Sequence, residues 1–382
     1  MITTINNEHK ELNFSSEREQ SQACLNSAEH EKNQGRKVLN VPNLRFPEFQ
    51  GEWEEYRIED ITENISSGRC KSHSPNGKYN LYGSTGIIGK TDEACYEGNL
   101  VLVARVGANA GSLQIINELC GITDNTLIIK PKEVNAQYLY FFLQHFNLNR
   151  LIFGSGQPLI TGGMLKKVKV SLGTVQEQNK LTKLLSLLDE RIATQNKIID
   201  KLQSLIKGIA QKIVHSNKTN VHLSECVECS SSTLQESDVC EHGAYPVYGA
   251  NGIVGYLDNY NTEGEAVYII KDGSGVGTVS YVTGKCSATG TLNTLQAKEG
   301  YSLQYLYYLL KVFNFEPYKT GMAIPHIYFK DYGKVKVFCP SYTEQLQYAR
   351  LLSAIDSELS IEKNFLTSLS LQKQYLLRHM FI

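Results

Sequence analysis

Apolar residues recur at alternating steps of four and three along two long stretches of the chain. In the first stretch, residues 174–215, this spacing is the heptad pattern of a coiled-coil seam. The seam positions are Leu181, Leu185, Leu188, Ile192, Gln195, Ile199, Leu202, Ile206, Ile209 and Ile213. The pattern predicts a helix of roughly 55 to 60 Å at 1.5 Å per residue. Such a helix has one narrow apolar stripe and is polar elsewhere, so it must pair with another helix.

The same row of residues closes the chain at residues 341–382. Its seam positions are Tyr348, Leu352, Ile355, Leu359, Glu362, Leu366, Leu369, Lys373, Leu376 and Met380, where Leu352 follows Leu185 by 167 residues. Tandem copies of one unit usually pack about a pseudo-two-fold axis, so we expect an antiparallel helix pair, although the heptads alone also permit a parallel one. At this offset Gln195 corresponds to Glu362, and we expect the two polar residues to meet near the axis and fix the register.

Short runs of β-branched and aromatic residues between glycine turns precede each long helix, and the two sets match. YGSTGIIG at 82–89 is answered by YGANGIVG at 248–255, and KKVKV at 166–170 by GKVKV at 333–337. Such runs predict strands and hairpins. The chain therefore encodes two tandem mixed α/β units, an α+β fold. The predicted boundaries are 1–40 for a flexible N-terminal extension, 41–172 for the first unit, 173–215 for the first long helix, 216–340 for the second unit and 341–382 for the second long helix.

The segment at 41–58 has a different composition from the strands that follow it. It contains two prolines and the apolar residues Leu44, Phe46, Phe49 and Trp53. This composition predicts an extended arm that docks onto the first unit. Trp53, the one tryptophan of the chain, is expected to anchor the arm in the core.

Composition narrows the class of protein. Of the 382 residues, 41% are hydrophobic and 20% are charged, which is typical of globular proteins. No membrane span or secretory signal is found, and the nine scattered cysteines favour reduced thiols, so we expect a cytoplasmic protein without disulfides. The net charge of -1, from 38 basic and 39 acidic residues, argues against a simple polyanion-binding protein. If nucleic acid is bound, basic residues must cluster locally, or a partner must supply phosphate contacts.

The order and duplication of these motifs resemble a known family. The residues that carry the likeness are NVPNLRFPEFQGEW at 40–53, the two repeated glycine hairpins, the segments around Pro158 and Pro325, and the starts of the two long helices. Together they resemble the specificity subunit of a type I restriction-modification system. The resemblance implies two target recognition domains separated by a pair of long antiparallel coiled-coil helices. The first forty residues depart from the family pattern.

The same resemblance implies a function in DNA binding and no catalysis. Each target recognition domain would read one half of an asymmetric, bipartite double-stranded DNA target, and the helices would set the distance between the half-sites. The expected partners are two adenine methyltransferase subunits and the restriction subunits that act as translocases. No cofactor is expected in this chain, whereas the partner subunits would use S-adenosylmethionine, ATP and Mg.

The glycine-bearing loops are the candidate DNA-binding surfaces, because glycine lets a backbone approach phosphates and adjacent polar side chains reach base edges. The candidates are Ser84, Thr85, Arg105, Asn109, Ser155 and Gln157 in the first unit, and Asn251, Lys271, Ser274, Thr320 and His326 in the second. Arg105 and Lys271 occupy equivalent positions and can pair with phosphate or guanine. The alternative for each of these residues is a plain turn position.

Other motifs give weaker signals. GSTGIIGKT at 83–91 nearly matches a phosphate-binding loop, but its spacing is one residue too long. Cys226, Cys229, Cys240 and His242 are residue types that bind zinc, yet the first unit has no equivalent set, and we favour a chance grouping without a metal. A basic face on the first long helix, formed by Lys183, Arg191, Lys197 and Lys201, could contact DNA or a partner, or simply be solvated.

Two other functional classes compete with a DNA-specificity subunit. One is a coiled-coil scaffold whose units bind proteins or glycans, and the other is a stand-alone enzyme with an unrecognised site. The methyltransferase tetrapeptide [DN]PP[FYW] and a helicase phosphate loop are absent from the sequence. We therefore predict no catalytic residues in this chain.

Overall fold

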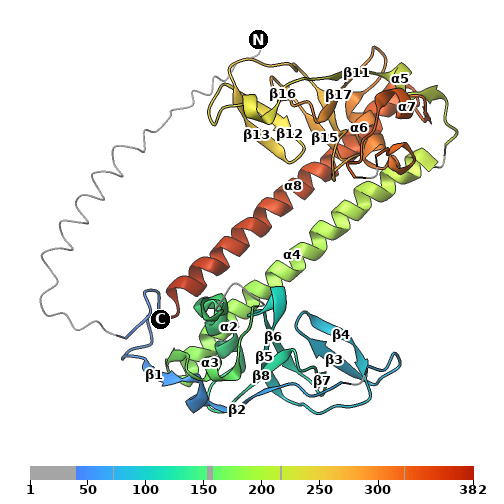
Figure 1. Ribbon diagram of the computed structural model, residues 1–382. Coiled ribbons are helices and arrows are strands. Elements are labelled where there is room, and N and C mark those ends of the chain that lie inside the picture. Colours follow the sequence, from blue (N-terminus) through green and yellow to red (C-terminus); the bar gives the residue numbers. More distant parts are fainter. Residues whose placement is uncertain (1–39, 72, 153–157, 216, 322) are drawn as a thin grey trace, which may run out of the picture. The chain divides into compact units, whose positions relative to one another are not determined.

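The computed structural model describes residues 40–71, 73–152, 158–215, 217–321 and 323–382 (Figure 1). The chain divides into two compact units. One contains the residues up to Ser186 together with Lys373–Ile382, and the other is Leu187–Gln372. Each long helix therefore contributes a segment to both units.

The first unit is built on an antiparallel four-stranded sheet. In spatial order its strands are β2 (Thr62–Ser67), β8 (Thr126–Pro131), β5 (Asn99–Ala104) and β6 (Leu113–Asn117). A three-stranded sheet follows the order β4 (Gly86–Thr91), β3 (Tyr79–Gly83) and β7 (Gly121–Ile122), in which β3 and β7 are parallel. The unit also contains the strand pair β1 (Glu54–Arg57) and β9 (Lys169–Leu172), and the short helices η1 (Ile58–Ile61), η2 (Gly107–Asn109), η3 (Leu148–Leu151) and α3 (Gly162–Lys166).

Strand β5 shows why the core has two layers. Its residues from Leu100 to Ala104 are all buried, because both faces of the central strand are covered. Val101 and Val103 pack with helix α2 (Ala136–Phe146), whereas Leu100 and Leu102 pack on the opposite face with Ile122 of β7. The two-residue period of a strand thus divides one apolar run between two cores.

The second unit repeats this architecture. Its four-stranded sheet has the order β11 (Val227–Ser231), β17 (Leu292–Ala297), β14 (Ala266–Ile270) and β15 (Val279–Val282). Its three-stranded sheet has the order β13 (Gly252–Leu257), β12 (Tyr245–Gly249) and β16 (Ser287–Ala288). A further strand pair consists of β10 (Val221–His222) and β18 (Lys336–Val337). The short helices are α5 (Leu223–Cys226), η4 (Glu236–Asp238), η5 (Glu316–Tyr318) and α7 (Phe329–Tyr332). Even the irregularity is shared, since the hairpin register shifts between Leu81 and Tyr82 and between Val247 and Tyr248.

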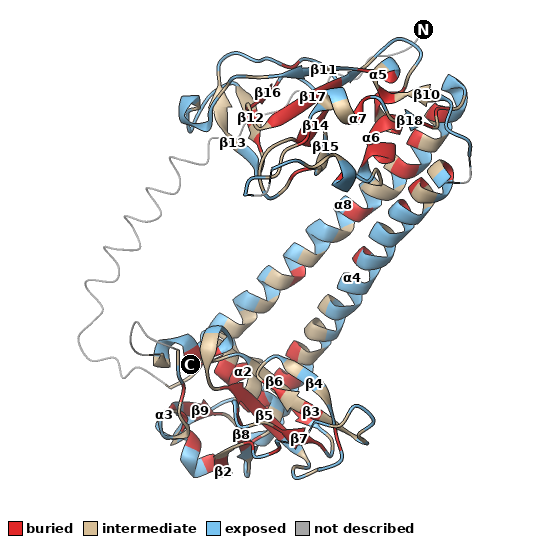
Figure 2. Cartoon of the chain, turned by 45° about the vertical axis from the view of Figure 1, so that its right-hand side comes forward, coloured by how far each residue is buried: buried red, intermediate tan, exposed pale blue. Residues whose placement is uncertain are grey.

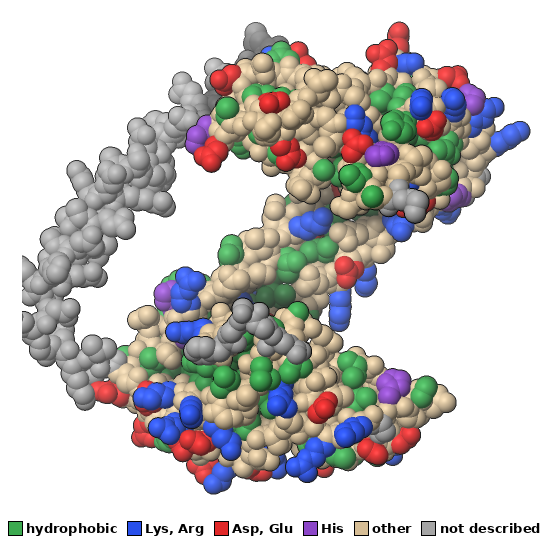
Figure 3. All heavy atoms as spheres, in the orientation of Figure 1, with side chains coloured by type: hydrophobic (Ala, Val, Ile, Leu, Met, Phe, Trp, Pro, Cys, Tyr) green, Lys and Arg blue, Asp and Glu red, His purple; other side chains and the backbone are tan. Residues whose placement is uncertain are grey.

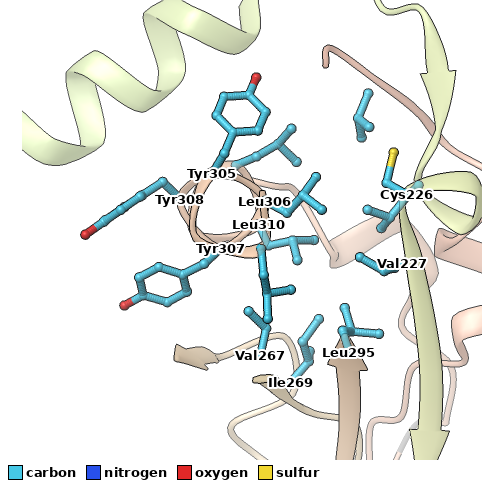
Figure 4. Packing of buried hydrophobic residues seen from close by; sticks show 14 of the residues in the cluster. Cys226, Val227, Val267, Ile269, Leu295, Tyr305, Leu306, Tyr307, Tyr308 and Leu310 are labelled. Atoms are coloured by element: carbon cyan, nitrogen blue, oxygen red, sulfur yellow. The ribbon is translucent and has the colours of Figure 1, made fainter. Parts of the chain in front are cut away.

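Helix α6 (Leu303–Lys311) takes the place of α2 in the second unit. Its buried side chains Leu306 and Leu310 belong to one cluster with Val267 and Ile269 of β14, and Figure 4 shows these side chains directed toward the sheet. A polar side chain caps each of the two helices. Ser302 accepts a hydrogen bond from the backbone N–H of Tyr305, as Asn135 does from Gln137 at the start of α2.

The two long helices are α4 (Val175–His215) and α8 (Tyr342–His379). Within the second unit they run antiparallel. Gln195 Nε2 donates to the backbone oxygen of Glu362 at 3.2 Å and also to the Glu362 carboxylate, whereas Ile213 and Leu352 line one small cavity. Residue numbers thus rise along one helix as they fall along the other. The predicted antiparallel pairing and the meeting of the two polar seam residues are confirmed.

The predicted seam positions are buried or half-buried, and Figure 2 shows red and tan segments between exposed ones along α4 and α8. Leu185, Gln195, Leu352 and Leu359 are buried, and Leu188, Ile192, Ile355 and Glu362 are half-buried. The prediction that the helices are polar elsewhere is wrong. Large apolar side chains outside the seam are exposed, namely Leu187, Ile198 and Leu205 on α4 and Leu351, Ile361, Phe365 and Leu371 on α8. None of the helices in the described ranges is both long and apolar enough to cross a membrane.

Both ends of the described chain meet in the first unit, where the predicted arm docks. The backbone N–H of Leu44 donates to the carbonyl of His379 at 2.8 Å. Arg45 forms a bidentate ion pair with Glu177 of α4, in which Nε and Nη2 lie 2.7 and 2.9 Å from the carboxylate oxygens. Trp53 Nε1 donates to the same carboxylate at 3.1 Å. Trp53 is only 4% exposed, so its predicted role as a core anchor is confirmed.

Candidate nucleic-acid interface

In the first unit, two loops distant in sequence meet at the end of β5. The backbone N–H of Arg105 donates to Asn125 O, and the carbonyl of Arg105 accepts from Ile160 N, each at 2.9 Å. The N–H of Gly107 donates to Pro158 O at 3.1 Å. Gly107 has a φ of +77°, a left-handed conformation that favours glycine. This edge, defined by residues 105–111 and 158–160, is called the first edge below.

The Arg105 side chain is held in place at the first edge but is not fully paired. Its Nη1 donates to Ser67 Oγ at the end of β2, at 3.3 Å. Its Nε and the neighbouring Thr126 Oγ1 are buried without a hydrogen-bond partner in the described part of the chain. A guanidinium carries five N–H donors, and an unsatisfied buried donor costs about 1–3 kcal/mol. Arg105 as a whole is half-buried, so the part of the guanidinium that is not enclosed can contact a ligand, whereas the buried Nε cannot do so without a local rearrangement.

The second unit builds the same edge from different side chains. The N–H of Lys271 donates to Thr291 O at 2.9 Å, and its carbonyl accepts from Ile327 N at 3.0 Å. The N–H of Gly273 donates to Pro325 O at 2.9 Å, as Gly107 does to Pro158. This second edge, residues 271–277 and 325–327, brings Lys271, Ser274 and His326 together. Thr320 joins them, because its backbone pairs with that of His326 at 2.8 and 2.9 Å.

The two edges differ most where their loops touch. In the first edge Val106 pairs with Leu159, and at the same place in the second edge Asp272 pairs with His326. The Asp272 carboxylate lies 3.6 Å from His326 Nδ1, which makes an ion pair when the imidazole is protonated. One backbone framework thus presents an apolar pair in one unit and an ionisable pair in the other.

The remaining predicted residues lie on the hairpins of the small sheets or outside the described residues. Ser84 and Thr85 form the turn between β3 and β4, and Asn251 lies in the turn between β12 and β13. Gln114 Nε2 donates to Gly83 O at 2.9 Å, so the first turn lies beside β6. Ser155 and Gln157 fall outside the described residues. Asn109 lies exposed in the loop of the first edge.

A polar cluster on the small sheet of the first unit was not predicted. The Glu118 carboxylate accepts hydrogen bonds from Asn80 Nδ2, at 2.9 Å, and from the Tyr82 hydroxyl. Burial, followed by the hydrogen bond to Glu118, raises the pKa of Tyr82 to about 12. The second unit has Pro246 in place of Asn80, so the cluster is specific to one unit. An alignment of the two hairpins shows the difference between Asn80 and Pro246, but no sequence motif identifies Glu118.

Two weaker candidates receive no support from the geometry. The near-match to a phosphate-binding loop forms a β-turn and strand β4, whereas such a loop leads into a helix. Cys226 Sγ lies 3.7 Å from Cys339 Sγ, and Cys240 is exposed beside Tyr256. Among the described residues, no three His, Cys, Asp or Glu side chains gather closely enough to hold a metal ion.

The duplicated architecture agrees with comparisons to known proteins. A family model described as the type I restriction modification DNA specificity domain matches the chain twice, at residues 50–204 and 216–370. The chain belongs to this family. Each specificity domain so matched includes one mixed α/β unit and most of the long helix that follows it.

This chain is similar to proteins named as type I specificity subunits, and its fold is similar to that of a solved one. A protein of Mycoplasma genitalium named as a type I specificity subunit is 26% identical over 81% of this chain and 88% of its own length. The specificity subunit of the Escherichia coli type I restriction enzyme EcoprrI is 27% identical over 30% of this chain and 28% of its own length. The crystal structure of a type I S subunit from M. genitalium has a TM-score of 0.68 at 19% identity, covering 90% of this chain and 99% of that one.

Membership in the family decides between the functional classes that the sequence left open. The type I specificity subunit is a DNA sequence-specificity subunit that recognises DNA and performs no catalysis itself. Its family is the DNA specificity domain of type I restriction modification. A scaffold for proteins or glycans, or a stand-alone enzyme, is not favoured. The residues that contact DNA remain a prediction.

Proposed function

We propose that this specificity subunit reads an asymmetric, bipartite DNA target, with one half-site at each of the two edges. The observation that carries the proposal is the contrast between equal backbones and unequal side chains. Val106 and Leu159 offer apolar contacts suited to a thymine methyl, whereas Asp272 and His326 offer hydrogen-bonding groups suited to base edges. Arg105 and Lys271 supply a positive charge at the same place in both edges. Different half-sites follow from these differences.

We infer that the partners are two adenine methyltransferase subunits and the restriction subunits. A reader made of two like units suits two identical partners on DNA. The exposed apolar side chains on α4 and α8 give a helical partner a place to pack, and Figure 3 shows hydrophobic side chains exposed along the long helices. Within the second unit, the guanidinium of Arg191 on α4 lies 5.5 Å from the ring of Phe365 on α8, so both helices contribute to one such surface.

The charge of the chain also supports partners at the DNA. With a net charge of -1, the subunit has little excess charge to neutralise phosphates, and Figure 3 shows basic and acidic side chains interspersed over one face of the first unit. The partners would therefore supply much of the phosphate contact. S-adenosylmethionine, ATP and Mg would bind to those subunits, and the complex would act on DNA in the cytoplasm.

We further propose that α4 and α8 set the spacer between the half-sites. α4 has 41 residues, which corresponds to about 62 Å at 1.5 Å per residue. The hydrogen bond from Gln195 to Glu362 holds α4 and α8 in one register. A polar pair within an apolar helix seam favours a single register over a sliding one. A single register would give a single spacer length.

A domain exchange tests the reading of separate half-sites. Residues 216–340 are replaced by a second copy of residues 41–172, and the full-length hybrid is co-expressed with its methyltransferase subunit. The methylated target should become an inverted repeat of the half-site read by the first unit. Methylation of the original asymmetric target by a folded hybrid would refute the proposal.

A further inference from the structure

An exposed isoleucine lies at the same place in both units. Ile87 on β4 and Ile253 on β13 are 57% and 53% exposed, and they are 166 residues apart, the offset of the two hairpins. Each follows the left-handed glycine that closes its hairpin turn, Gly86 with a φ of +112° and Gly252 with a φ of +104°. A single exposed aliphatic side chain is common on protein surfaces. An exposed isoleucine at the same position of both units suggests a shared function.

Several side chains near this isoleucine differ between the two units, although the glycines of the hairpin are repeated. The turn itself changes from Ser84 and Thr85 to Ala250 and Asn251, and the exposed Lys90 of β4 becomes Tyr256 of β13. Surfaces that read two different half-sites must differ from each other. A surface that is the same in both units should face something that is the same at both half-sites.

Two things are the same at both half-sites, namely the DNA backbone and the bound partner. An isoleucine side chain offers no hydrogen bond and no charge to a phosphate. In the loops that follow β4 and β13, the two units share exposed acidic residues. Asp92 is matched by Asp258, and Glu97 is matched by Glu263. Carboxylates repel phosphates. The repeated surface therefore fits a protein better than a DNA backbone.

We propose that Ile87 and Ile253 are docking contacts for the methyltransferase subunit, with one copy of that subunit on each hairpin. The inference rests on the proposed function, because it uses the two identical partners. Protein interfaces concentrate their binding energy in a few central side chains surrounded by polar groups. An exposed isoleucine beside polar turn residues provides such an anchor, and each hairpin offers it once.

The test uses the full-length chain with the methyltransferase subunit from the same restriction-modification locus. Ile87→Ser and Ile253→Ser are made singly and together, with Ile87→Leu as a conservative variant. Each serine variant should weaken binding of one methyltransferase copy about tenfold, which corresponds to about 1.4 kcal/mol. The double variant should weaken both copies, and Ile87→Leu should bind as the wild type does. Native mass spectrometry during a titration counts the copies.

Thr85→Ala and Asn251→Ala are the matched controls, because they change exposed residues of the same turns that differ between the units. They should alter the affinity for one half-site and leave methyltransferase binding unchanged. Thermal melting verifies that the serine variants are folded. Unchanged methyltransferase binding by Ile87→Ser and Ile253→Ser overturns the inference, and so does a changed half-site preference at saturating methyltransferase, which would assign the isoleucines to DNA. A wild-type chain that binds neither methyltransferase nor DNA would refute the proposed function itself.

Discussion

Arg105 is a basic side chain of the first edge that uses only part of its hydrogen-bonding capacity. Its Nη1 bonds to Ser67, and its buried Nε has no partner among the described residues. Arg105→Ala should weaken binding of the complex to target DNA by about 1–3 kcal/mol if the guanidinium contacts a guanine. A phosphate contact would instead weaken binding to all sequences alike and reduce the salt slope by about 1. DNA titrations at several salt concentrations measure both quantities.

Arg57→Ala serves as the control for Arg105, because Arg57 is an exposed arginine of β1 that pairs with Glu59 at 3.5 Å. It should leave DNA affinity nearly unchanged. Equal effects of the two substitutions would show that only overall charge matters. The first edge would then have no special role in recognition.

Glu177 holds the N-terminal arm to α4. Its carboxylate is 2% exposed and is paired with Arg45 and Trp53. Glu177→Ala removes the acceptor of the buried Trp53 Nε1 and one partner of Arg45, which keeps the carbonyls of Gln50 and Gly51, so we expect a loss of about 1–3 kcal/mol in the free energy of unfolding. The equivalent Glu344 of α8 is exposed and bonds to Ser341, so Glu344→Ala should cost less than about 1 kcal/mol. Denaturant unfolding of both variants measures the difference, and equal losses would contradict the anchoring role.

Some of these side-chain contacts could be predicted from the sequence, and others could not. Gln195 and Glu362 could be paired in advance, because both interrupt an apolar row and they are related by the repeat offset. The partners of Glu177 could not be predicted in the same way, because Arg45 and Trp53 lie 132 and 124 residues away from it. Among the described residues of the second unit, the equivalent Glu344 forms no such triad. Of the predicted DNA residues, Lys271, Ser274, Thr320 and His326 were brought together by a loop contact that their sequence separation does not encode.

At the scale of elements, the end of α8 is a packing element of the first unit. Phe381 is 3% exposed, and its ring stacks on that of His145 on α2, with centroids 5.7 Å apart. Burial lowers the pKa of His145 below its usual 6.5. The unfolded chain therefore takes up this proton more readily than the folded one. The stabilisation is fully present above about pH 6.5 and is lost as the pH falls through the lower pKa of the folded state.

We expect the first unit to melt at a lower temperature as the pH falls from about 8 to about 5, partly because His145 becomes protonated. His145→Gln should reduce this pH dependence. Phe381→Ala should cost about 3–5 kcal/mol at neutral pH, because it removes a buried ring. Thermal melting across this pH range measures both effects. A pH profile identical in wild type and His145→Gln would contradict the assignment.

The elements themselves were largely predictable, with instructive exceptions. The repeated motifs located the hairpins and both long helices, since period and offset are visible in one sequence. The parallel pairing of β3 with the two-residue strand β7 was not visible, because so short a strand has no period. Nor were the exposed Leu187, Ile361 and Phe365 anticipated. A heptad seam predicts one apolar stripe, whereas these residues form a second apolar set on the same helices.

At the scale of the whole molecule, the long helices should act as a ruler for the spacer. Inserting seven residues into both α4 and α8 preserves the heptad seam and lengthens each helix by about 10 Å. At 3.4 Å per base pair, the tolerated spacer should grow by about three base pairs. Methylation of a set of targets with graded spacers measures this change. An unaltered spacer in a stable assembly would refute the ruler.

The central claim is that this chain alone decides which DNA sequence its complex recognises. Mapping methylated adenines across the genome of cells with and without the gene tests that claim most directly. We expect one asymmetric bipartite motif with a fixed spacer that is methylated only when the gene is present. Unchanged methylation after deletion of the gene, with the methyltransferase subunit still expressed, would contradict it.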